Sequence, residues 1–471
     1  MNLEFTDSLV IAVYFFAVIA IGFHSKHRKS ISNNSKFDFL LDGRRLTLPL
    51  FVATLVATWY GLILGVGEYV YSQGIVAWVC LGLPYYITAI LYAKFIAGKV
   101  QLSTAVSIPE QIRNNYGNVS GRFASGLVLI LTIPAAYILM LGTLIQMFTG
   151  LNITVSILIG TVSSVIYLFI GGFRADVLTN ALQFVLMYIG FGALFIFSVV
   201  KFGNIVTLAT GLPTTHLNFR GGNNWQIIIA WFIISLQTFI DPSFHQRSAA
   251  AKSPLVAKKG IFISVLFWIL FDFLTISTGL YARVHIKTEP LLAFPMLASE
   301  ILPVFWKGIF AVSLLATVMS SLNSYAFLSA ITIGKEFISP IFKNKKTDAF
   351  LIRFGLAIIS LIGIMLALLL PSTVQLIYKS ASIAVPGLLI PLLESYSSKK
   401  VLSSKQAMLM MGISSLLSLL WMILTVVVIL PIAIQNTIIS IEPMIPGIIL
   451  SFIMYIVIFI KSKFSNSLVL K

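Results

Sequence analysis

The chain has 471 residues, of which 58% are hydrophobic and 10% are charged, and its mean hydropathy is +0.99. A soluble domain carries about 25% charged residues, so this composition excludes a water-soluble globular fold. The single cysteine, Cys80, excludes an internal disulfide and a metal cluster built from cysteines.

Thirteen segments are candidates for membrane-spanning helices, because a span needs roughly 20 mainly apolar residues. They lie near residues 6–24, 46–71, 74–98, 119–149, 153–173, 175–200, 225–243, 259–282, 305–335, 349–370, 373–394, 405–430 and 441–461. No long polar segment separates them. We therefore expect an all-α membrane protein with a single integral membrane domain over residues 1–471.

The formal net charge of +17 gathers in alternate connections between these spans. The connection at 26–45 is rich in Lys and Arg, and later connections on the same side contribute further cations, among them Arg247. Cytoplasmic loops carry an excess of such residues, so the N-terminus is predicted outside and the C-terminus in the cytoplasm. Membrane orientation explains the charge, and neither a nucleic-acid partner nor an obligate protein partner is indicated.

The second span is unusual, because Gly61, Gly65 and Gly67 lie in it beside Thr54 and Thr58. Glycine weakens a helix, and a transporter can use an unwound stretch whose free carbonyls coordinate a cation. The same glycines also suit a close helix–helix interface. This span alone does not decide between the two interpretations.

The ninth span places Thr317, Ser320, Ser321 and Ser324 at i, i+3, i+4 and i+7, which is one helical face. Neutral hydroxyl oxygens suit a monovalent cation such as Na⁺. The alternative is that these hydroxyls bond to carbonyls of the preceding turn, which is the usual arrangement for serines in membrane helices.

Four ionisable side chains fall within spans or at their ends: Glu68, Asp241, Asp272 and Lys379. A charge at the bilayer centre costs about 3 kcal/mol, so such residues usually face a cavity or a partner. Asp272 and Lys379 have opposite signs and could form a salt bridge or bind a zwitterion or a carboxylate. Lys379 could instead extend toward the outer end of its span.

Two stretches between spans carry a resemblance to a known family. Residues 171–183 (GGFRADVLTNALQ) and 241–253 (DPSFHQRSAAAKS) resemble signatures of the sodium/solute symporter family, which includes bacterial proline and pantothenate carriers and sodium/glucose cotransporters. Segments 57–61 (ATWYG) and 316–322 (ATVMSSL) are also similar to family sequence. The resemblance implies a LeuT-type fold with two inverted five-helix repeats.

These repeats would cover roughly residues 46–200 and 225–394, with broken helices in the second and seventh spans forming a site at the midplane. The resemblance also implies a sodium site. Its ligands would be the carbonyls of Ala57, Tyr60 and Thr317 and the hydroxyls of Ser320 and Ser321.

Two positions depart from the family pattern. Many members carry Asp where this chain has Asn180, and a serine of a second sodium site is matched by Asn323. Without that carboxylate we expect one sodium ion per substrate. Asp176 lies one turn from Asn180 and could substitute for that carboxylate, but because it lies at the cytoplasmic end we expect it to be a solvated capping residue instead.

The substrate is expected beside the sodium ion. The resemblance aligns Leu64 and Trp268 with substrate-lining positions, and Gln237 lies near the expected break of the seventh span. The candidate substrate residues are Leu64, Glu68, Gln237, Asp241, Trp268, Asp272 and Lys379. Tyr85 and Tyr86 are weaker candidates, for which simple packing is the preferred interpretation.

The sequence therefore predicts a secondary active transporter. It would carry a small organic solute with Na⁺ into the cytoplasm by alternating access, as a multi-pass protein of the plasma membrane, here a bacterial inner membrane. An enzyme is not predicted, because HExxH, GxSxG and P-loop patterns are absent from the sequence. The alternatives are a proton-coupled symporter on the same fold, which Glu68 and Asp272 keep open, and a membrane sensor that does not transport.

Overall fold

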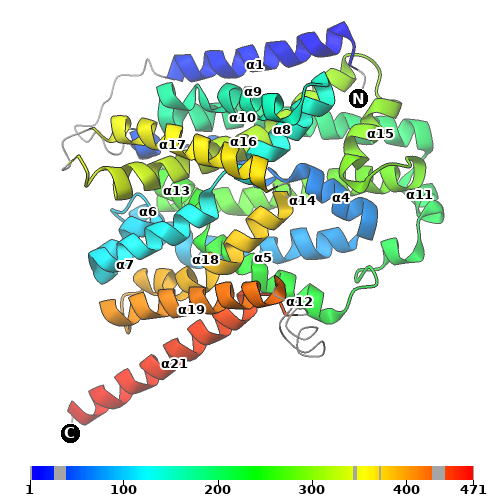
Figure 1. The fold of residues 1–471 in the computed structure, drawn as a ribbon. Coiled ribbons are helices and arrows are strands. Elements are labelled where there is room, and N and C mark those ends of the chain that lie inside the picture. The colour runs from blue at the N-terminus through cyan, green and yellow to red at the C-terminus, as the bar shows by residue number, and fades with distance from the viewer. Residues whose placement is uncertain (1–2, 26–38, 343–346, 371–372, 427–440, 470–471) are drawn as a thin grey trace.

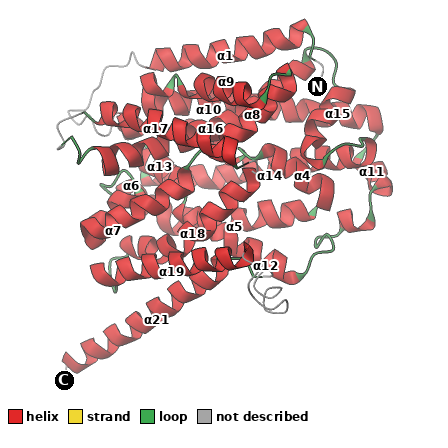
Figure 2. Ribbon diagram, viewed as in Figure 1, coloured by secondary structure: helices red, strands yellow, loops and turns green. Residues whose placement is uncertain are grey.

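The computed structural model describes residues 3–25, 39–342, 347–370, 373–426 and 441–469. Over these ranges the regular elements are helices, and an isolated bridge joins Leu46 to Ala251 (Figure 2). The prediction of an all-α protein is confirmed for this part of the chain.

The first half of the chain contains helices that differ widely in length. They are α1 (Phe5–Ser25), η1 (Asp42–Arg44), α3 (Leu48–Trp59), α4 (Ile63–Gln73), η2 (Trp78–Gly82), α5 (Leu83–Tyr92), η3 (Ala93–Ala97), α6 (Gly98–Leu102), α7 (Ile108–Thr132), α8 (Ala135–Thr149), α9 (Ile153–Val165), α10 (Leu168–Phe202), α11 (Ile205–Gly211) and η4 (Thr214–Leu217). Of these, η2 and η3 are π-helical turns.

The second half begins with an interrupted span and continues with longer helices. They are α12 (Trp225–Ile234), η5 (Ser235–Ile240), α13 (Pro242–Ala250), α14 (Pro254–His285), η6 (Pro290–Leu292), α15 (Ala293–Ile301), α16 (Trp306–Thr332), η7 (Ile333–Ile338), α17 (Asp348–Leu369), α18 (Thr373–Ser395), α19 (Ser404–Val426) and α21 (Met444–Val469).

Helix α16 forms the centre of the molecule. It packs against α10, α17, α1, α8, α3 and α7. Of the most apolar stretch of 18 residues in Trp306–Ile338, 89% is buried inside the protein. By contrast α1 and α21 lie on opposite sides of the bundle, and only 22% of the corresponding stretch of each is buried (Figure 1). Apolar side chains such as Phe5, Phe16 and Phe452 stay exposed on these outer helices, as a lipid-facing surface requires.

Ten helices are long and apolar enough to cross a membrane, or eleven if the bent pair α3 and α4 forms one span, within the described ranges. The predicted count of thirteen is therefore not confirmed. Helix α9, in the fifth candidate span, has 13 residues and is about 20 Å long, which is shorter than a hydrocarbon core of about 30 Å.

The motif at 171–183 is not a connection between two spans. It lies inside α10, which begins at Leu168 and bends at Gly172, where φ is 57° and ψ is −145°. A window of apolar residues cannot detect this bend, because a left-handed φ depends on the glycine alone. The second motif, at 241–253, likewise forms the short buried helix α13 rather than an open loop.

Candidate ion and substrate site

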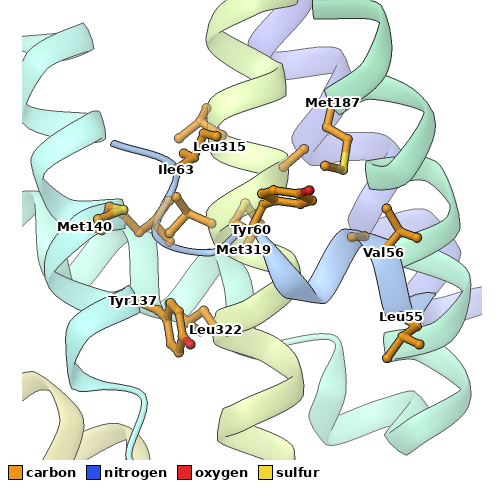
Figure 3. Packing of buried hydrophobic residues seen from close by; sticks show 14 of the residues in the cluster. Leu55, Val56, Tyr60, Ile63, Tyr137, Met140, Met187, Leu315, Met319 and Leu322 are labelled. Atoms are coloured by element: carbon orange, nitrogen blue, oxygen red, sulfur yellow. The ribbon is translucent and has the colours of Figure 1, made fainter. Parts of the chain in front are cut away.

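The break in the second span is real and lies at its centre. Helix α3 ends at Trp59, α4 begins at Ile63, and the two axes are bent by 59°. Figure 3 shows the unwound segment passing beside α16, with Tyr60 and Ile63 on either side of the break. A Cβ atom built on Gly61 would lie 2.3 Å from Cβ and Oγ of Ser321, so glycine is what permits this approach.

Serines of α16 meet backbone carbonyls of α3 immediately before the break. The Ser320 Oγ lies 2.6 Å from the Ala57 carbonyl oxygen and 2.8 Å from the Thr317 carbonyl oxygen, and its proton can be donated to one of them at a time. Ser321 Oγ donates to the Thr58 carbonyl over 2.6 Å. All five residues except Thr58, which is 4% exposed, are fully buried.

The expected sodium ligands are thus largely placed together, with one addition. Ser320 contacts the carbonyls of Ala57 and Thr317, Ser321 contacts the carbonyl next to that of Ala57, and Tyr60 follows at the C-terminal end of α3. The Thr58 carbonyl, which the sequence analysis missed, also faces this group of oxygens. The Thr317 hydroxyl instead bonds back to the Ser313 carbonyl over 2.6 Å, which is the alternative considered for this helical face.

This set of oxygens fits an alkali ion. It contains carbonyl and hydroxyl oxygens and no carboxylate, and its side chains are buried, with Thr58 and Tyr60 also lining a cavity. Because the oxygens already lie within hydrogen-bond distance of one another, small movements would replace hydrogen bonds between them by contacts with a small cation.

A buried ion pair lies directly beside this group of oxygens. Arg247 Nη2 is 3.3 Å from Asp176 Oδ2, and both side chains are fully buried. The same guanidinium donates to Thr58 Oγ1 and Ser324 Oγ, each over 2.8 Å, while Ser324 donates to Asp176 over 2.9 Å. The network joins α3, α10, α13 and α16.

Two expectations about these charges were therefore wrong. Asp176 is not a solvated capping residue, and Arg247 is not a loop cation on the cytoplasmic side. Their positions in the chain suggested exposure, but α13 packs its whole length into the protein. The presence of opposite charges in the two family-like motifs was the available signal that they pair.

A cavity of about 1390 Å³ lies beside the break between α3 and α4. Among the candidate substrate residues, Glu68, Gln237, Asp241, Asp272 and Lys379 line it. The remaining two candidates do not. Leu64 is 1% exposed and Trp268 is 0% exposed, and both lie in the hydrophobic core, where the Trp268 ring packs against the ring of Trp59 with centroids 5.1 Å apart.

Asp272 is held in this cavity by two tyrosines. Tyr60 Oη donates to Asp272 Oδ1 over 2.8 Å, and Tyr86 Oη donates to Asp272 Oδ2. The ion pairs among the described residues do not include one between Asp272 and Lys379, although both side chains line the cavity. The salt-bridge interpretation is wrong in this conformation, and the preference for a mere packing role of Tyr86 was wrong as well.

Asp241 has a structural task at the interruption of the seventh span. There α12 gives way to the 3₁₀ turn η5, and α13 begins one residue after Asp241. The Asp241 Oδ1 accepts hydrogen bonds from the backbone of Ser243 and Phe244, and Oδ2 accepts one from Tyr325 over 2.7 Å. Nearby Gln237 donates to Tyr85 Oη over 3.1 Å, so this tyrosine also takes part in the site.

Known transporters resemble this chain over most of its length. The sodium/proline symporter of Escherichia coli strain K12 is 26% identical over 388 residues, which are 75% of each chain. High-affinity choline transporter 1 of Drosophila melanogaster is 23% identical over 390 residues, which are 77% of this chain but 62% of that transporter. Sodium/proline symporter 2 of Staphylococcus saprophyticus is 23% identical and matches over 94% of this chain and 91% of its own.

Solved structures share the fold at lower identity. A Na⁺-coupled sialic acid symporter in a substrate-bound outward-open state matches with a TM-score of 0.75 and 15% identity, over 96% of this chain and 98% of its own. A nucleobase-cation-symport-1 family transporter matches with a TM-score of 0.55 and 14% identity, over 91% and 96%. These neighbours are LeuT-like transporters. The sequence model of the sodium:solute symporter family matches residues 39–388, and the chain belongs to that family.

Proposed function

We propose that this protein is a sodium-coupled symporter that carries one Na⁺ with a small organic solute into the cytoplasm by alternating access. The observation that carries the proposal is the contact of Ser320 and Ser321 with the Ala57 and Thr58 carbonyls at the break of the second span. Membership of the family and the fold shared with a Na⁺-coupled symporter support the choice of sodium over protons.

Coupling of ion and solute has a direct route through Tyr60. Its backbone lies at the break, among the proposed sodium ligands, while its phenol donates to Asp272 in the cavity. Any change in the backbone at Tyr60 on sodium binding would move a group that contacts the cavity. This supports transport of both species in one cycle, because a ligand shifts an equilibrium only through contacts that differ between states.

The proposed ratio of one sodium ion rests on the neighbouring ion pair. The Asp176 carboxylate accepts hydrogen bonds from Arg247 and Ser324, and Asn180 supplies an amide where many family members carry a carboxylate. Arg247 therefore already balances the negative charge that a second sodium ion would need. A measured coupling ratio of two would contradict this part of the proposal.

The conformation is compatible with solute entry from outside. The cavity extends from Thr58 and Asp272 to Ser72 and Asn223, which lie on the outer side in the proposed orientation. On the other side, the start of the first interrupted span is held against the end of the second one.

The contacts on that inner side are backbone and guanidinium hydrogen bonds. Leu46 N donates to the Ala250 carbonyl over 3.0 Å, and the Lys252 N donates to the Leu46 carbonyl over 3.0 Å. Arg44 donates to the carbonyls of Gln101 and Ser103 over 2.9 and 2.5 Å. Inward release would require these contacts to open, which is the movement that alternating access predicts.

The test of the sodium site combines Ser320→Ala with Ser321→Ala. We expect the purified wild-type protein to unfold at a higher temperature in sodium chloride than in potassium chloride, because a ligand that binds the native state stabilises it. The double variant should lose this difference and should lose sodium-driven accumulation of solute in proteoliposomes. The matched control is Ser198→Ala on α10, a buried serine that only bonds back to the Leu194 carbonyl. An unchanged sodium response in the double variant would remove the site.

A further inference from the structure

The Asp272 carboxylate in the cavity has hydrogen-bond donors within the protein, but its negative charge is not balanced by an ion pair among the described residues. It lies near the middle of α14, which spans Pro254–His285, and it is half-buried on the cavity wall. Its partners Tyr60 and Tyr86 donate two hydrogen bonds but bring no positive charge. Within the described parts of the chain, the ion pairs do not include Asp272. A carboxylate at this depth without a cation is unfavourable, so a partner from outside the chain is indicated.

Aromatic rings surround the same part of the cavity. Trp59, Tyr60, Trp78 and Tyr85 all line it, and the rings of Trp59 and Tyr85 meet edge to face with centroids 5.2 Å apart. The faces of such rings attract cations, and the attraction is stronger where water is excluded. These ring faces offer no such attraction to an anionic group.

Gly82 permits the close approach of the groups around the Asp272 carboxylate. A Cβ atom built on Gly82 would lie 2.7 Å from Asp272 Oδ2 and 2.9 Å from Trp78 Cδ1, so a larger residue would displace the carboxylate or the Trp78 ring. Trp78 and Gly82 are the two ends of the π-helical turn η2. Single π-helical turns occur frequently at functional sites, because the wider turn redirects side chains.

The other charges of the cavity do not neutralise Asp272. Asp241 is also acidic, but Ser243, Phe244 and Tyr325 already donate to it. Glu68 is exposed further toward the mouth, and Lys379 is the basic residue among the described lining. With three acids and one base, the lining favours a positively charged group over a negative one.

We propose that the transported solute carries an ammonium group, which binds to Asp272 between the rings of Tyr60 and Trp78. This inference rests on the proposed sodium-coupled symport and names the class of its cargo. Two sources share this chemistry. One is an amine without a carboxylate, and the other is a zwitterion whose carboxylate lies toward Lys379.

The experiment measures thermal stabilisation of the purified full-length protein in sodium chloride by pairs of probes. Choline is compared with 3,3-dimethyl-1-butanol, its neutral isostere, and L-proline with cyclopentanecarboxylate, which lacks the ammonium. D-Glucose and N-acetylneuraminate serve as solutes without an ammonium group. We expect choline or L-proline to raise the unfolding temperature and its isostere to leave it unchanged. Binding of choline identifies the amine class, and binding of L-proline alone identifies the zwitterion class.

The variant Asp272→Asn should weaken binding of the active probe about tenfold or more and keep the stabilisation by sodium alone. Asp272→Glu restores the charge and should recover part of the affinity. Glu300→Gln is the control, because Glu300 is exposed on the surface in a pair with Lys201. If Asp272→Asn does not fold, Gly82→Val provides the second variant, since its side chain would displace the carboxylate or the Trp78 ring.

Several outcomes overturn the proposal. One is stabilisation by an isostere, D-glucose or N-acetylneuraminate that equals or exceeds that by the ammonium probes. Another is affinity of Asp272→Asn for the active probe within twofold of wild type. Failure of both ammonium probes, in a protein that still responds to sodium, also overturns it and leaves the sodium site standing. Loss of the sodium response in wild type would instead count against the proposed function.

Discussion

At the scale of single residues, the pair Asp176 and Arg247 shows how a family-like motif can serve packing and charge balance together. Both side chains are fully buried, and four residues besides Asp176 accept hydrogen bonds from the Arg247 guanidinium, through four hydroxyls and one carbonyl. A buried pair of this kind contributes little compared with apolar packing, but removing one partner leaves an uncompensated charge. Removing one charge of the pair should therefore lower the stability of the protein much more than removing both charges together.

We predict that Asp176→Asn lowers the stability of the purified protein by about 3–5 kcal/mol, because Arg247 then stays buried without an anion. Combining it with Arg247→Met removes both charges and should be less destabilising than Asp176→Asn alone. Thermal unfolding in detergent measures the order of the variants. The control pair is Lys201 and Glu300, which is exposed, so Glu300→Gln should cost about 0–1 kcal/mol. Equal stability of Asp176→Asn and wild type would contradict the role of the pair.

At the scale of elements, the break between α3 and α4 depends on how closely it approaches α16. Gly61 has an ordinary negative φ, so conformational freedom is not the reason for glycine here. The reason is space, because Ser321 occupies the position that a side chain at residue 61 would need. The break and the serine face are therefore parts of one contact and not two separate features.

We predict that Gly61→Ala displaces α3 from α16 and weakens sodium binding about tenfold or more, which is about 1.4 kcal/mol. The added methyl would have to push apart the Ser321 side chain and the α3 carbonyls that it contacts. Sodium titration of the unfolding temperature measures the effect. Gly192→Ala on α10 is the matched control, since a Cβ atom there would meet nothing within 4 Å. A sodium affinity equal to that of the control would show that the close approach is not needed.

At the scale of the whole molecule, the sequence predicted best those structural features whose residues all lie within a single span. The glycines around Gly61 indicated either a broken helix or a close helix–helix contact, and the structure has both, while the spacing of Ser320 and Ser321 predicted a shared polar face. Membership of the family followed from short motifs. These patterns are local in the sequence, so they can be recognised without knowing which helices pack against each other.

The missed features depend on contacts between distant parts of the chain. Tyr86 and Asp272 are 186 residues apart, and no periodicity links a tyrosine on one helix to a carboxylate on another. Arg247 was interpreted as a loop cation, because charge counting does not reveal that a short helix turns inward. The fifth candidate span, which contains α9, is not confirmed for a similar reason, since hydropathy does not record where a helix ends.

The proposed orientation of the molecule in the membrane rests on the distribution of charge alone, and cysteine labelling can test it. The sole cysteine of the chain, Cys80, is buried with no exposed surface, so the natural protein should react slowly with a polar thiol reagent. Two exposed serines offer matched positions at opposite ends of the fold. Ser72 lines the cavity near its mouth, and Ser398 lies in the connection between α18 and α19 beside Lys399 and Lys400.

We predict that Ser72→Cys is labelled in intact cells by a membrane-impermeant methanethiosulfonate reagent, and that Ser398→Cys is labelled only after permeabilisation. The physical reason is the excess of Lys and Arg in the connections on the side of Ser398, which holds that side in the cytoplasm. Sodium in the outer medium should raise the labelling of Ser72→Cys if it favours the conformation with the open cavity, because a bound ion shifts the population toward the state it contacts best. Labelling of Ser398→Cys but not Ser72→Cys in intact cells would reverse the orientation, and with it the proposed direction of transport.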